Sequence, residues 1–465
     1  MSSLTDADTI EQLLPGFAGK VIRPGDAEYD KARTGFYGDI DRRPAGIVRP
    51  TDASQVVQVV AAARDGGLEL AVRSGGHSIA GHSVVDGGIV VDLAAMRGLD
   101  IDAEERTAWA QTGLTAGDYT TAAAEHGLAT GFGDTSTVGI GGLTLGGGVG
   151  FLSRAHGLTI DNLLAAELVT ADGQIVEIDA ENHPDLFWAI RGGGGNFGVA
   201  TRLRFRLHEL ESVVGGMLML PATAEVIREF VALAEAAPDE LSTIANVMPA
   251  PPMPFVPADH HGRLVIMGLV CYAGAAEEGE AALAPFRSLA TPVADLVRPI
   301  PYPAMFEGEG PGGAADEDFH PTAVGRTMFL ETVEQDAAEL IVDRLSSSDA
   351  MMRVTQLRVL GGAVARVPDD ATAYGHRRSR IMANVAAFYD GPDDRAVRTD
   401  WVNDFAADLR QSDTGAYSNF LADEGPERVR AAYPGATWDR LREIKAKYDP
   451  ANLFRHNQNV PPAAA

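Results

Sequence analysis

The residues best placed to do chemistry form a glycine loop that ends in one imidazole, Arg73-Ser-Gly-Gly-His77. The loop follows an apolar segment at 68–72, which predicts a strand leading directly into it. Glycines allow backbone amides to approach a phosphate closely, and such a loop can also hold a nucleophile against a cofactor. This stretch therefore predicts a site in which His77 faces a phosphate-bearing cofactor.

A second and denser run of glycines covers residues 139–150. The run contains too much glycine to predict a helix interior or an ordinary strand, so we expect a second irregular loop. Two glycine loops in one chain indicate a large phosphate-bearing ligand.

The elements that must position the first loop form a strand-helix-strand unit. A short strand at 45–50 precedes a helix at 54–64, which either Thr51 or Asp52 can cap. Two glycines end this helix before the strand at 68–72 begins. We expect this unit to deliver the chain directly into the His77 loop.

Further elements of both kinds surround the second loop. Residues 87–93 predict a strand, and residues 116–126 predict a helix. Two strands at 164–170 and 174–178 flank Asp172-Gly173, which is a strong hairpin signal. Mixed helices and strands around both loops predict an α+β cofactor domain.

One familiar motif is rejected because of its neighbours. Residues 193–198 match the pattern G-x-G-x-x-G, but a helix-like segment at 184–191 precedes them and a strand-like segment at 199–207 follows. A dinucleotide-binding fingerprint requires a strand before the glycines and a helix after them. Nicotinamide binding at this position is therefore not expected. The sequence also has no G-x-S-x-G elbow and no P-loop, so neither a hydrolase nor a nucleotide triphosphatase has local support.

Composition limits the remaining choices. With 465 residues, two domains are expected, and no apolar run is long enough to cross a bilayer. The formal net charge of −27 argues against nucleic-acid binding. Cys271 is the single cysteine, which excludes disulfides and cysteine-rich metal sites and fits a reducing compartment. Because the first residues are acidic and lack a signal-like apolar region, we expect a cytoplasmic protein.

Several phrases together resemble a known family. They are the His77 loop, Thr135-Ser-Thr-Val-Gly-Ile-Gly-Gly142, the whole stretch 184–198, and a tail with Tyr448-Asp-Pro-Ala-Asn-Leu-Phe454 and Asn457-Gln-Asn459. The chain resembles the vanillyl-alcohol-oxidase superfamily of flavoproteins, and within it the berberine-bridge-enzyme-like branch that includes bacterial hydroxynicotine oxidases and oxidases of secondary metabolism.

The resemblance implies an α+β, two-lobed PCMH-type FAD-binding fold with an inserted α/β substrate domain, in which helices cover an antiparallel sheet. The expected divisions are an FAD-binding domain at 1–211 with its core at about 40–211, a substrate-binding domain at 212–424, and a C-terminal segment at 425–465 that returns to the FAD domain.

The resemblance also implies that His77 bonds covalently to FAD. Many relatives make a second flavin bond through a cysteine in C-P-T-V-G-V-G-G, but Thr135 stands in its place here and implies a single linkage. Val138 matches a position that controls access of oxygen, and valine is the residue typical of oxidases. Ile160 also matches a position near the cofactor in relatives. The other expected cofactor-binding residues are Arg73, Ser74, Gly75, Gly76, Ser78, His82, Thr137, Gly141, Gly142, Gly146, Gly147, Gly148, Gly150, Asn162, Val199, Asn457 and Asn459.

The two histidines of the first loop could also be read as a metal pair. His82 lies five residues after His77, but no carboxylate or cysteine ligands stand nearby, so no metal site is expected. The neighbouring pair His260-His261 is interpreted as a solvated turn.

The catalytic base is where this chain departs from its relatives. Alcohol-oxidising relatives carry tyrosines at two positions that here hold Ile79 and Phe420. A base assists removal of hydride from an alcohol because the hydroxyl proton must leave, whereas a neutral amine needs no such help. Tyr417, Tyr374 and His376 are the substitute candidates. Asn419 is expected to orient a group in the pocket.

The sequence thus predicts an FAD-dependent oxidase that takes hydride from a small-molecule amine, alcohol or secondary metabolite and passes electrons to oxygen, giving hydrogen peroxide. Two alternatives stay open: a dehydrogenase that uses another electron acceptor, and a flavin-retaining binding protein without turnover, which the missing tyrosines suggest. No nucleic acid or membrane partner is expected.

Overall fold

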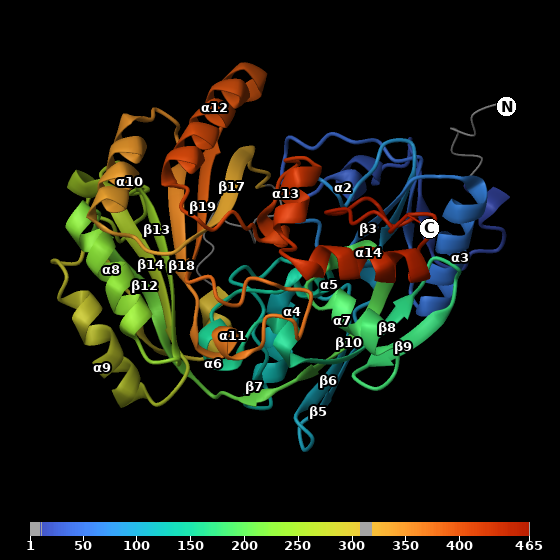
Figure 1. Cartoon of the computed structure of the whole chain (residues 1–465), viewed down its shortest axis with the longest axis horizontal. Coiled ribbons are helices and arrows are strands. Elements are labelled where there is room, and N and C mark those ends of the chain that lie inside the picture. Colours follow the sequence, from blue (N-terminus) through green and yellow to red (C-terminus); the bar gives the residue numbers. More distant parts are fainter. Residues whose placement is uncertain (1–9, 11, 307–318, 465) are drawn as a thin grey trace.

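The computed structural model describes residue 10, residues 12–306 and residues 319–464. Its chain forms two lobes that lie side by side, one built from the first half of the sequence and one from residues that follow (Figure 1). Among the described helices, none is both long enough and apolar enough to cross a bilayer.

The His77 loop leaves a four-stranded sheet in the first lobe. Its strand order is β1 (Lys20–Ile22), β2 (Gly46–Arg49), β4 (Ile89–Asp92) and β3 (Leu70–Arg73), with β2 and β3 parallel to β4. The expected strand-helix-strand unit is confirmed, with helix α3 (Ala53–Gly66) between β2 and β3. Asp52 is the residue that caps α3, because its side chain accepts from the Gln55 amide.

A five-stranded antiparallel sheet completes this lobe. Its order is β5 (Leu99–Asp102), β6 (Thr107–Gln111), β10 (Val199–Arg206), β8 (Leu163–Val169) and β9 (Ile175–Asp179). The hairpin predicted around Asp172-Gly173 joins β8 and β9. Helix α4 (Ala116–Ala124) begins at a capping box formed by Thr115 and Asp118. Because helix α7 (Pro184–Ile190) precedes β10, the rejection of a nicotinamide fingerprint at 193–198 agrees with the structure.

The second lobe contains one large antiparallel sheet. Its order is β15 (Ala294–Asp295), β12 (Val213–Pro221), β14 (Leu264–Tyr272), β13 (Leu241–Pro249), β18 (Arg353–Val359), β19 (Ile381–Phe388) and β17 (Ala323–Leu330), and β16 (Arg298–Ile300) also pairs with β12.

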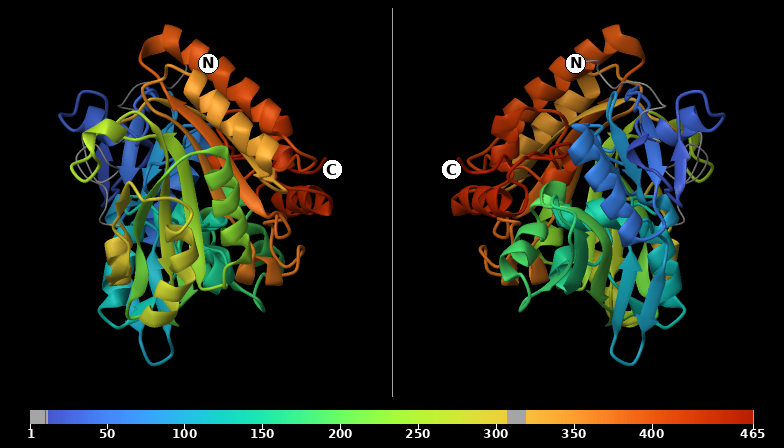
Figure 2. Two further views of the ribbon diagram at one scale, coloured as in Figure 1. Left: turned by 90° about the vertical axis from the view of Figure 1, so that its left-hand side faces the viewer. Right: turned by 90° about the vertical axis from the view of Figure 1, so that its right-hand side faces the viewer.

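Helices cover the outer face of this sheet, as the left panel of Figure 2 shows. They are α8 (Ala224–Ala236), α9 (Ala276–Arg287), α10 (Gln335–Ser347) and α12 (Gly391–Leu409). Alternate strand residues such as Leu357, Ala383 and Val385 join the core beneath these helices. Because side chains alternate along a strand, the residues between them face the first lobe.

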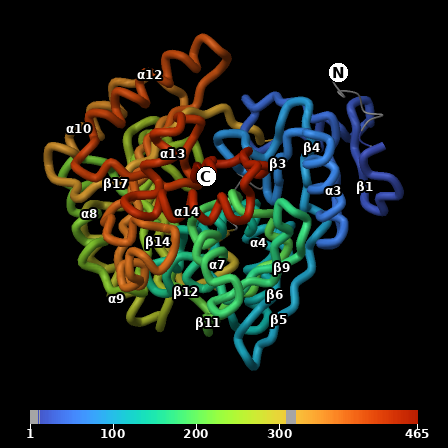
Figure 3. Tube along the Cα trace, turned by 45° about the vertical axis from the view of Figure 1, so that its right-hand side comes forward, coloured from blue at the N-terminus to red at the C-terminus, as the bar shows by residue number. Residues whose placement is uncertain are grey.

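The C-terminal segment crosses back to the first lobe. Helices α13 (Pro426–Ala431) and α14 (Ala436–Tyr448) follow the second lobe, and Leu441, Ile444 and Val460 pack in a core of the first lobe. In Figure 3 this last, red part of the tube lies between the two lobes. The division at residues 211 and 424 stays a prediction.

The expectation of an irregular loop throughout 139–150 is wrong. Helix α5 spans Ile140–Gly146, and only its C-terminal end is irregular, where Gly147 and Gly148 adopt φ values of 137° and 81°. Glycine serves close packing in this helix: a Cβ added to Gly146 would lie 2.0 Å from Oδ1 of Asn419. Tertiary packing thus overrides the low helix propensity of glycine.

The remaining elements are short. They are α2 (Tyr29–Arg33), β7 (Leu128–Ala129), α6 (Ser153–His156), β11 (His208–Glu209), α11 (Gly362–Arg366) and 3-10 helices at Leu93–Ala95, Thr159–Asn162, Gly194–Asn196, Ala258–His260, Tyr302–Phe306 and Ser418–Phe420.

Candidate active site

A cavity of about 510 Å³ lies where the lobes meet. Its walls come from the His77 loop, from the segment that leads into α5, from the inner face of the large sheet and from the C-terminal segment. This volume lies within the usual range for a site that encloses a small molecule or cofactor group. The expected site residues that line it are Ser74, Gly75, Gly76, His77, Ser78, His82, Thr135, Val138, Gly141, Gly142, Tyr417, Asn419 and Asn457.

His77 presents a neutral imidazole to this cavity. Its ring stacks on Phe36, with centroids 4.4 Å apart, and its Nε2 lies 3.0 Å from the hydroxyl of Thr137. Burial, together with the nearby charge of Arg73, lowers the pKa of His77 to about 4. A neutral ring nitrogen keeps the lone pair that an attack on carbon requires.

Arg73 itself supports the loop from outside the cavity. Its guanidinium donates to the carbonyl oxygens of Ala32 at 2.6 Å and Thr34 at 2.7 Å. These bonds hold the start of the loop against the segment that leads to Phe36. Arg73 is therefore placed to orient His77 and not to contact a ligand directly.

The two glycine segments touch backbone to backbone. A Cβ on Gly75 would lie 2.1 Å from the amide nitrogen of Gly139, and one on Gly139 would lie 2.2 Å from the amide nitrogen of Gly75. Any side chain at either position would push the segments apart. Gly142 differs, since a Cβ there meets nothing within 4 Å, and it lines the cavity. The close contact shapes a wall on which a flat or phosphate-bearing group can lie against exposed backbone.

The buried polar atoms on the cavity wall that have no hydrogen-bond partner within the described chain include Nε2 of His82 and Oδ1 of Asn457. Burial lowers the pKa of His82 to about 4, with the charges of Arg42 and His456 adding to the effect, so its ring is neutral. Buried polar atoms normally have hydrogen-bond partners. A cofactor rich in donors and acceptors, such as FAD, fits these two positions and the glycine wall.

Tyr417 and Asn419 lie together above α5. The Tyr417 hydroxyl oxygen accepts from the amide of Gly148 at 2.9 Å and from Nδ2 of Asn419 at 2.9 Å. Asn419 Nδ2 also donates to the carbonyl of Leu143 at 3.0 Å. Burial raises the pKa of Tyr417, so this phenol stays protonated and its oxygen is already an acceptor twice. Tyr417 and Asn419 thus hold the end of α5 in place, and neither offers a free base.

The structure does not bring Tyr374 and His376 to the cavity lining. His376 stacks on Phe329 and its Nε2 lies 3.1 Å from the carbonyl of Ala432, while burial lowers its pKa. Tyr374 packs edge-on against Tyr417 with its hydroxyl buried, and burial raises its pKa. Both side chains belong to the packing behind Tyr417, so the cavity lining does not support them as the base, and their assignment stays a prediction.

Other expected cofactor residues also lie outside the cavity lining, and several of them contact the segments that form it. Asn162 bonds to the carbonyls of His156 and Leu158 and to His208, and Val199 and Ile160 are core residues. The Gly148 amide is occupied by Tyr417. The remaining members of this set are Thr137, Gly146, Gly147, Gly150 and Asn459.

Several polar residues on the cavity wall were not expected from the sequence, and four of them lie where the two lobes meet. Asp134 precedes Thr135, and Gln356, Arg358 and Asn384 project from the inner face of the large sheet. The alternation of Gln356 and Arg358 with buried Leu357 is a strand signal that could have pointed to them. The contact between Arg358 and Asp134 joins distant parts of the chain, so no local sequence pattern predicts it.

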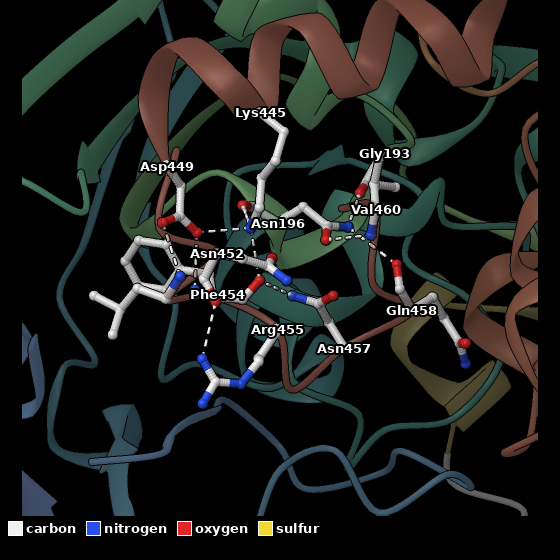
Figure 4. A network of polar contacts seen from close by, with 11 residues as sticks. Gly193, Asn196, Lys445, Asp449, Asn452, Phe454, Arg455, Asn457, Gln458 and Val460 are labelled. Atoms are coloured by element: carbon white, nitrogen blue, oxygen red, sulfur yellow. Dashed lines mark hydrogen bonds and ion pairs between the residues drawn. The ribbon is translucent and has the colours of Figure 1, made fainter. Parts of the chain in front are cut away.

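A buried lysine of the tail and the residues around it bind the first lobe at Asn196 (Figure 4). Lys445 Nζ donates to Asp449 at 2.7 Å, to the carbonyl of Asn196 at 2.6 Å and to the carbonyl of Phe454 at 2.9 Å. The amide of Val460 donates to the Asn196 side chain at 2.9 Å. The glycine-rich phrase around Asn196 thus anchors the tail segment 454–458 that lines the cavity.

Comparison with known proteins agrees with this geometry. Residues 44–179 match the family described as FAD binding domain, and residues 416–461 match the family described as berberine and berberine like. The (R)-6-hydroxynicotine oxidase of Paenarthrobacter nicotinovorans is 31% identical, over 96% of this chain and 97% of that protein. An FAD-linked oxidoreductase of Dictyostelium discoideum is 30% identical over 97% of both chains. The chain belongs to the berberine-bridge-enzyme-like family.

The solved structure of 6-hydroxy-D-nicotine oxidase from Arthrobacter nicotinovorans matches this berberine-bridge-enzyme-like protein with a TM-score of 0.85. The identity is 29%, and the match covers 96% of this chain and 98% of that one. The predicted α+β, two-lobed flavoprotein fold is confirmed, and the protein is an FAD-linked oxidoreductase. Within the described residues, no cluster of three or more His, Cys, Asp or Glu could hold a metal ion.

Proposed function

We propose that this protein is an FAD-dependent oxidase that carries its flavin on His77 through a single covalent bond. It removes hydride from a C–H bond of a small molecule, an amine or an alcohol, and oxygen takes up the electrons to give hydrogen peroxide. The names of relatives support this proposal, since they include a hydroxynicotine oxidase and a xylooligosaccharide oxidase.

The observation that carries the proposal is the neutral imidazole of His77 on the wall of the cavity. Phe36 fixes the plane of the ring, and the Thr137 hydroxyl holds Nε2. His77 would hold the flavin through a bond from a ring nitrogen to its 8α-methyl carbon; that carbon would lose a C–H bond, and oxygen would take up the two electrons released. The flavin supplies the chemistry when bound, because it accepts hydride from substrate carbon.

The single linkage and the use of oxygen rest on two other residues. Thr135 lines the cavity where many relatives have a cysteine, and Cys271 lies fully buried in β14 of the other lobe. Burial raises the pKa of Cys271, which keeps the thiol unreactive. Val138 lines the cavity as the small side chain typical of oxidases. The single buried cysteine also fits a reducing compartment, so we extend the proposal to a cytoplasmic enzyme.

Two experiments test the proposal, the first for the covalent flavin and the second for oxidase activity. Mass spectrometry of the intact protein should show the chain plus one FAD. Anaerobic incubation with amines, alcohols and sugars should bleach the flavin with at least one compound, and air should restore the colour rapidly with release of peroxide. Reoxidation by a quinone but not by oxygen would instead identify a dehydrogenase. A flavin that no compound bleaches, together with tight binding of one of them, would identify a binding protein.

A further inference from the structure

Asp134 is the one carboxylate among the described residues that line the cavity. It stands directly before Thr135 in the segment that leads into α5, and its side chain keeps 20% of its surface exposed. The Thr135 hydroxyl donates to its Oδ1 at 3.3 Å. Because an ionised carboxylate offers several acceptor positions, Asp134 has capacity left for a group inside the cavity.

The guanidinium of Arg358 reaches Asp134 from the other lobe. Nη2 of Arg358 lies 2.5 Å from Oδ2 of Asp134, and only 5% of the Arg358 side chain is exposed. This ion pair joins the two lobes, since Asp134 stands before α5 and Arg358 stands on β18. The pair therefore places a negatively charged acceptor at the junction of the two lobes.

A chain of side-chain hydrogen bonds holds Arg358 from behind. Its Nε donates to Gln356 Oε1 at 2.8 Å, and Gln356 Nε2 donates to Asn246 Oδ1 at 2.8 Å. Asn246 in turn donates to the carbonyl of Met267 at 3.2 Å. These residues stand on the adjacent strands β18, β13 and β14, so the guanidinium is fixed by the sheet itself. A fixed guanidinium gives the Asp134 carboxylate one orientation.

The same guanidinium lies over the ring of Phe420, with its carbon 5.2 Å from the ring centroid. Phe420 is the position at which alcohol-oxidising relatives carry a tyrosine. The carboxylate paired with Arg358 thus lies beside the place left without a phenol. The tyrosine hydroxyl that Phe420 lacks and the Asp134 carboxylate would thus occupy the same corner of the cavity.

Burial or existing hydrogen bonds make other titratable groups on the wall poor proton acceptors, and among these groups is Tyr433, whose pKa burial raises. Tyr417 already accepts two hydrogen bonds, and burial raises the pKa of Tyr37 to about 12. His456 is bound to Glu69 through Nε2 at 2.5 Å. His82 faces the charges of Arg42 and His456, which together with burial lower its pKa to about 4.

We propose that Asp134, oriented by Arg358, accepts the hydroxyl proton of an alcohol substrate during its oxidation. The proposal rests on the proposed function, which supplies FAD as the two-electron oxidant. The substrate O–H bond breaks and its proton moves to a carboxylate oxygen of Asp134. The C–H bond breaks with its electron pair, which leaves as hydride to the bound FAD, and the substrate carbon becomes a carbonyl. Water then receives the proton from Asp134. Arg358 is a positioning residue, since it acts through the carboxylate.

Three groups face Asp134. They are Arg358 from β18, the hydroxyl of the adjacent Thr135, and Tyr302 from the 3-10 helix at 302–306. Burial keeps the pKa of Tyr302 well above its usual value, and the charge of Asp134 contributes to this shift. Tyr302 therefore stays neutral, and an acid limb in the rate of alcohol oxidation reports Asp134.

The experiment compares Asp134→Asn with wild type and with Asp239→Asn, which removes a carboxylate from an exposed arginine pair with Arg366. The probes are benzyl alcohol, glucose, xylobiose, benzylamine and 6-hydroxynicotine, and the measurement is the rate of anaerobic flavin bleaching against pH. With the best alcohol, Asp134→Asn should be slower by about 100-fold or more and should lose the acid limb. Asp239→Asn should behave as wild type.

Further readouts separate chemistry from structure. Arg358→Gln should lower the bleaching rate with the best alcohol much more than the rate with benzylamine, because the Asp134 carboxylate loses the cation that orients it. In resting enzyme, a pH titration of the visible flavin spectrum should show a transition that Asp134→Asn lacks, at an unchanged thermal unfolding midpoint.

The outcomes that oppose the two proposals are different. If Asp134→Asn bleaches with the alcohol as fast as wild type or keeps the acid limb, Asp134 is not the acceptor and the oxidase proposal stands. Equal changes in the alcohol and amine rates of Arg358→Gln would remove the assigned role of Arg358. If no probe bleaches the wild-type flavin, the proposed function and the proton acceptor fail together.

Discussion

The imidazole of His77 lies face to face with the ring of Phe36, with 4.4 Å between the ring centroids and 18° between the planes. The stack fixes the plane in which the His77 ring nitrogens point. Phe36 belongs to a segment that Arg73 ties to the loop through the carbonyl of Thr34. Arg73 therefore anchors the segment that carries Phe36, and Phe36 in turn orients the ring of His77.

His77→Ala should give a folded protein that binds FAD but releases it in acid denaturant, because no other residue is proposed to bond the flavin. The measurement is the flavin absorbance that remains with acid-precipitated protein. His82→Ala is the matched control, since it removes a second cavity imidazole and should leave the colour with the precipitate. A precipitate of His77→Ala that stays yellow would contradict the proposed linkage.

The local signals of the sequence predict the frame around His77 well. Asp52 caps α3, Gly67 ends it in a left-handed conformation with φ of 63°, and Asp172-Gly173 turns the hairpin. Each of these features depends on residues that lie within a few positions of one another, so the sequence displays them directly.

Features that depend on packing between distant segments could not be predicted. Gly146 of α5 serves packing, because Asn419 approaches it too closely for any side chain, and this contact comes from a distant part of the chain. Tyr374 and His376 are turned away from the cavity by Phe329 and Tyr417, which come from other parts of the chain. The pairing of Asp134 with Arg358 also joins two lobes, and no spacing in the sequence encodes it.

Lys445→Met should destabilise the protein strongly. The Lys445 and Asp449 side chains are both fully buried, 2.7 Å apart, and removal of the ammonium leaves a buried carboxylate without its counter-charge. The expected loss in the free energy of unfolding is about 3 to 5 kcal/mol, measured by urea denaturation. Lys447→Met is the control, because its pair with Asp185 is exposed and should contribute at most about 1 kcal/mol. Equal losses in the two variants would show that the buried pair has no special role.

The stability of the protein should fall as pH is lowered from about 6.5 to about 4. His208 stacks on His156 with centroids 3.9 Å apart, and burial lowers the pKa of His208 from 6.5 to about 4, with the charges of His156 and Arg206 adding to the effect. Between pH 6.5 and about 4, His208 is protonated in the unfolded chain but neutral in the folded chain, so acid favours unfolding.

The test is the thermal unfolding midpoint of His208→Gln across this pH window. The variant keeps a side-chain amide that can bond Asn162 but has no titrating ring, so its midpoint should depend less steeply on pH than that of wild type. His126→Gln replaces an exposed histidine and should keep the wild-type slope. A His208→Gln slope equal to that of wild type would assign the acid sensitivity to other groups.

Phe420→Tyr should raise the rate of alcohol oxidation more than the rate of amine oxidation. The new hydroxyl would stand in the corner where Arg358 lies over the ring, and it could share the proton of an alcohol substrate. A neutral amine already has a lone pair that assists departure of the hydride, so it gains little. We expect an increase of about 10-fold for the best alcohol in the anaerobic bleaching rate. Phe36→Tyr places a hydroxyl on another wall of the same cavity and should not show this preference. If Phe420→Tyr changes alcohol and amine rates equally, the missing phenol does not explain the substrate preference.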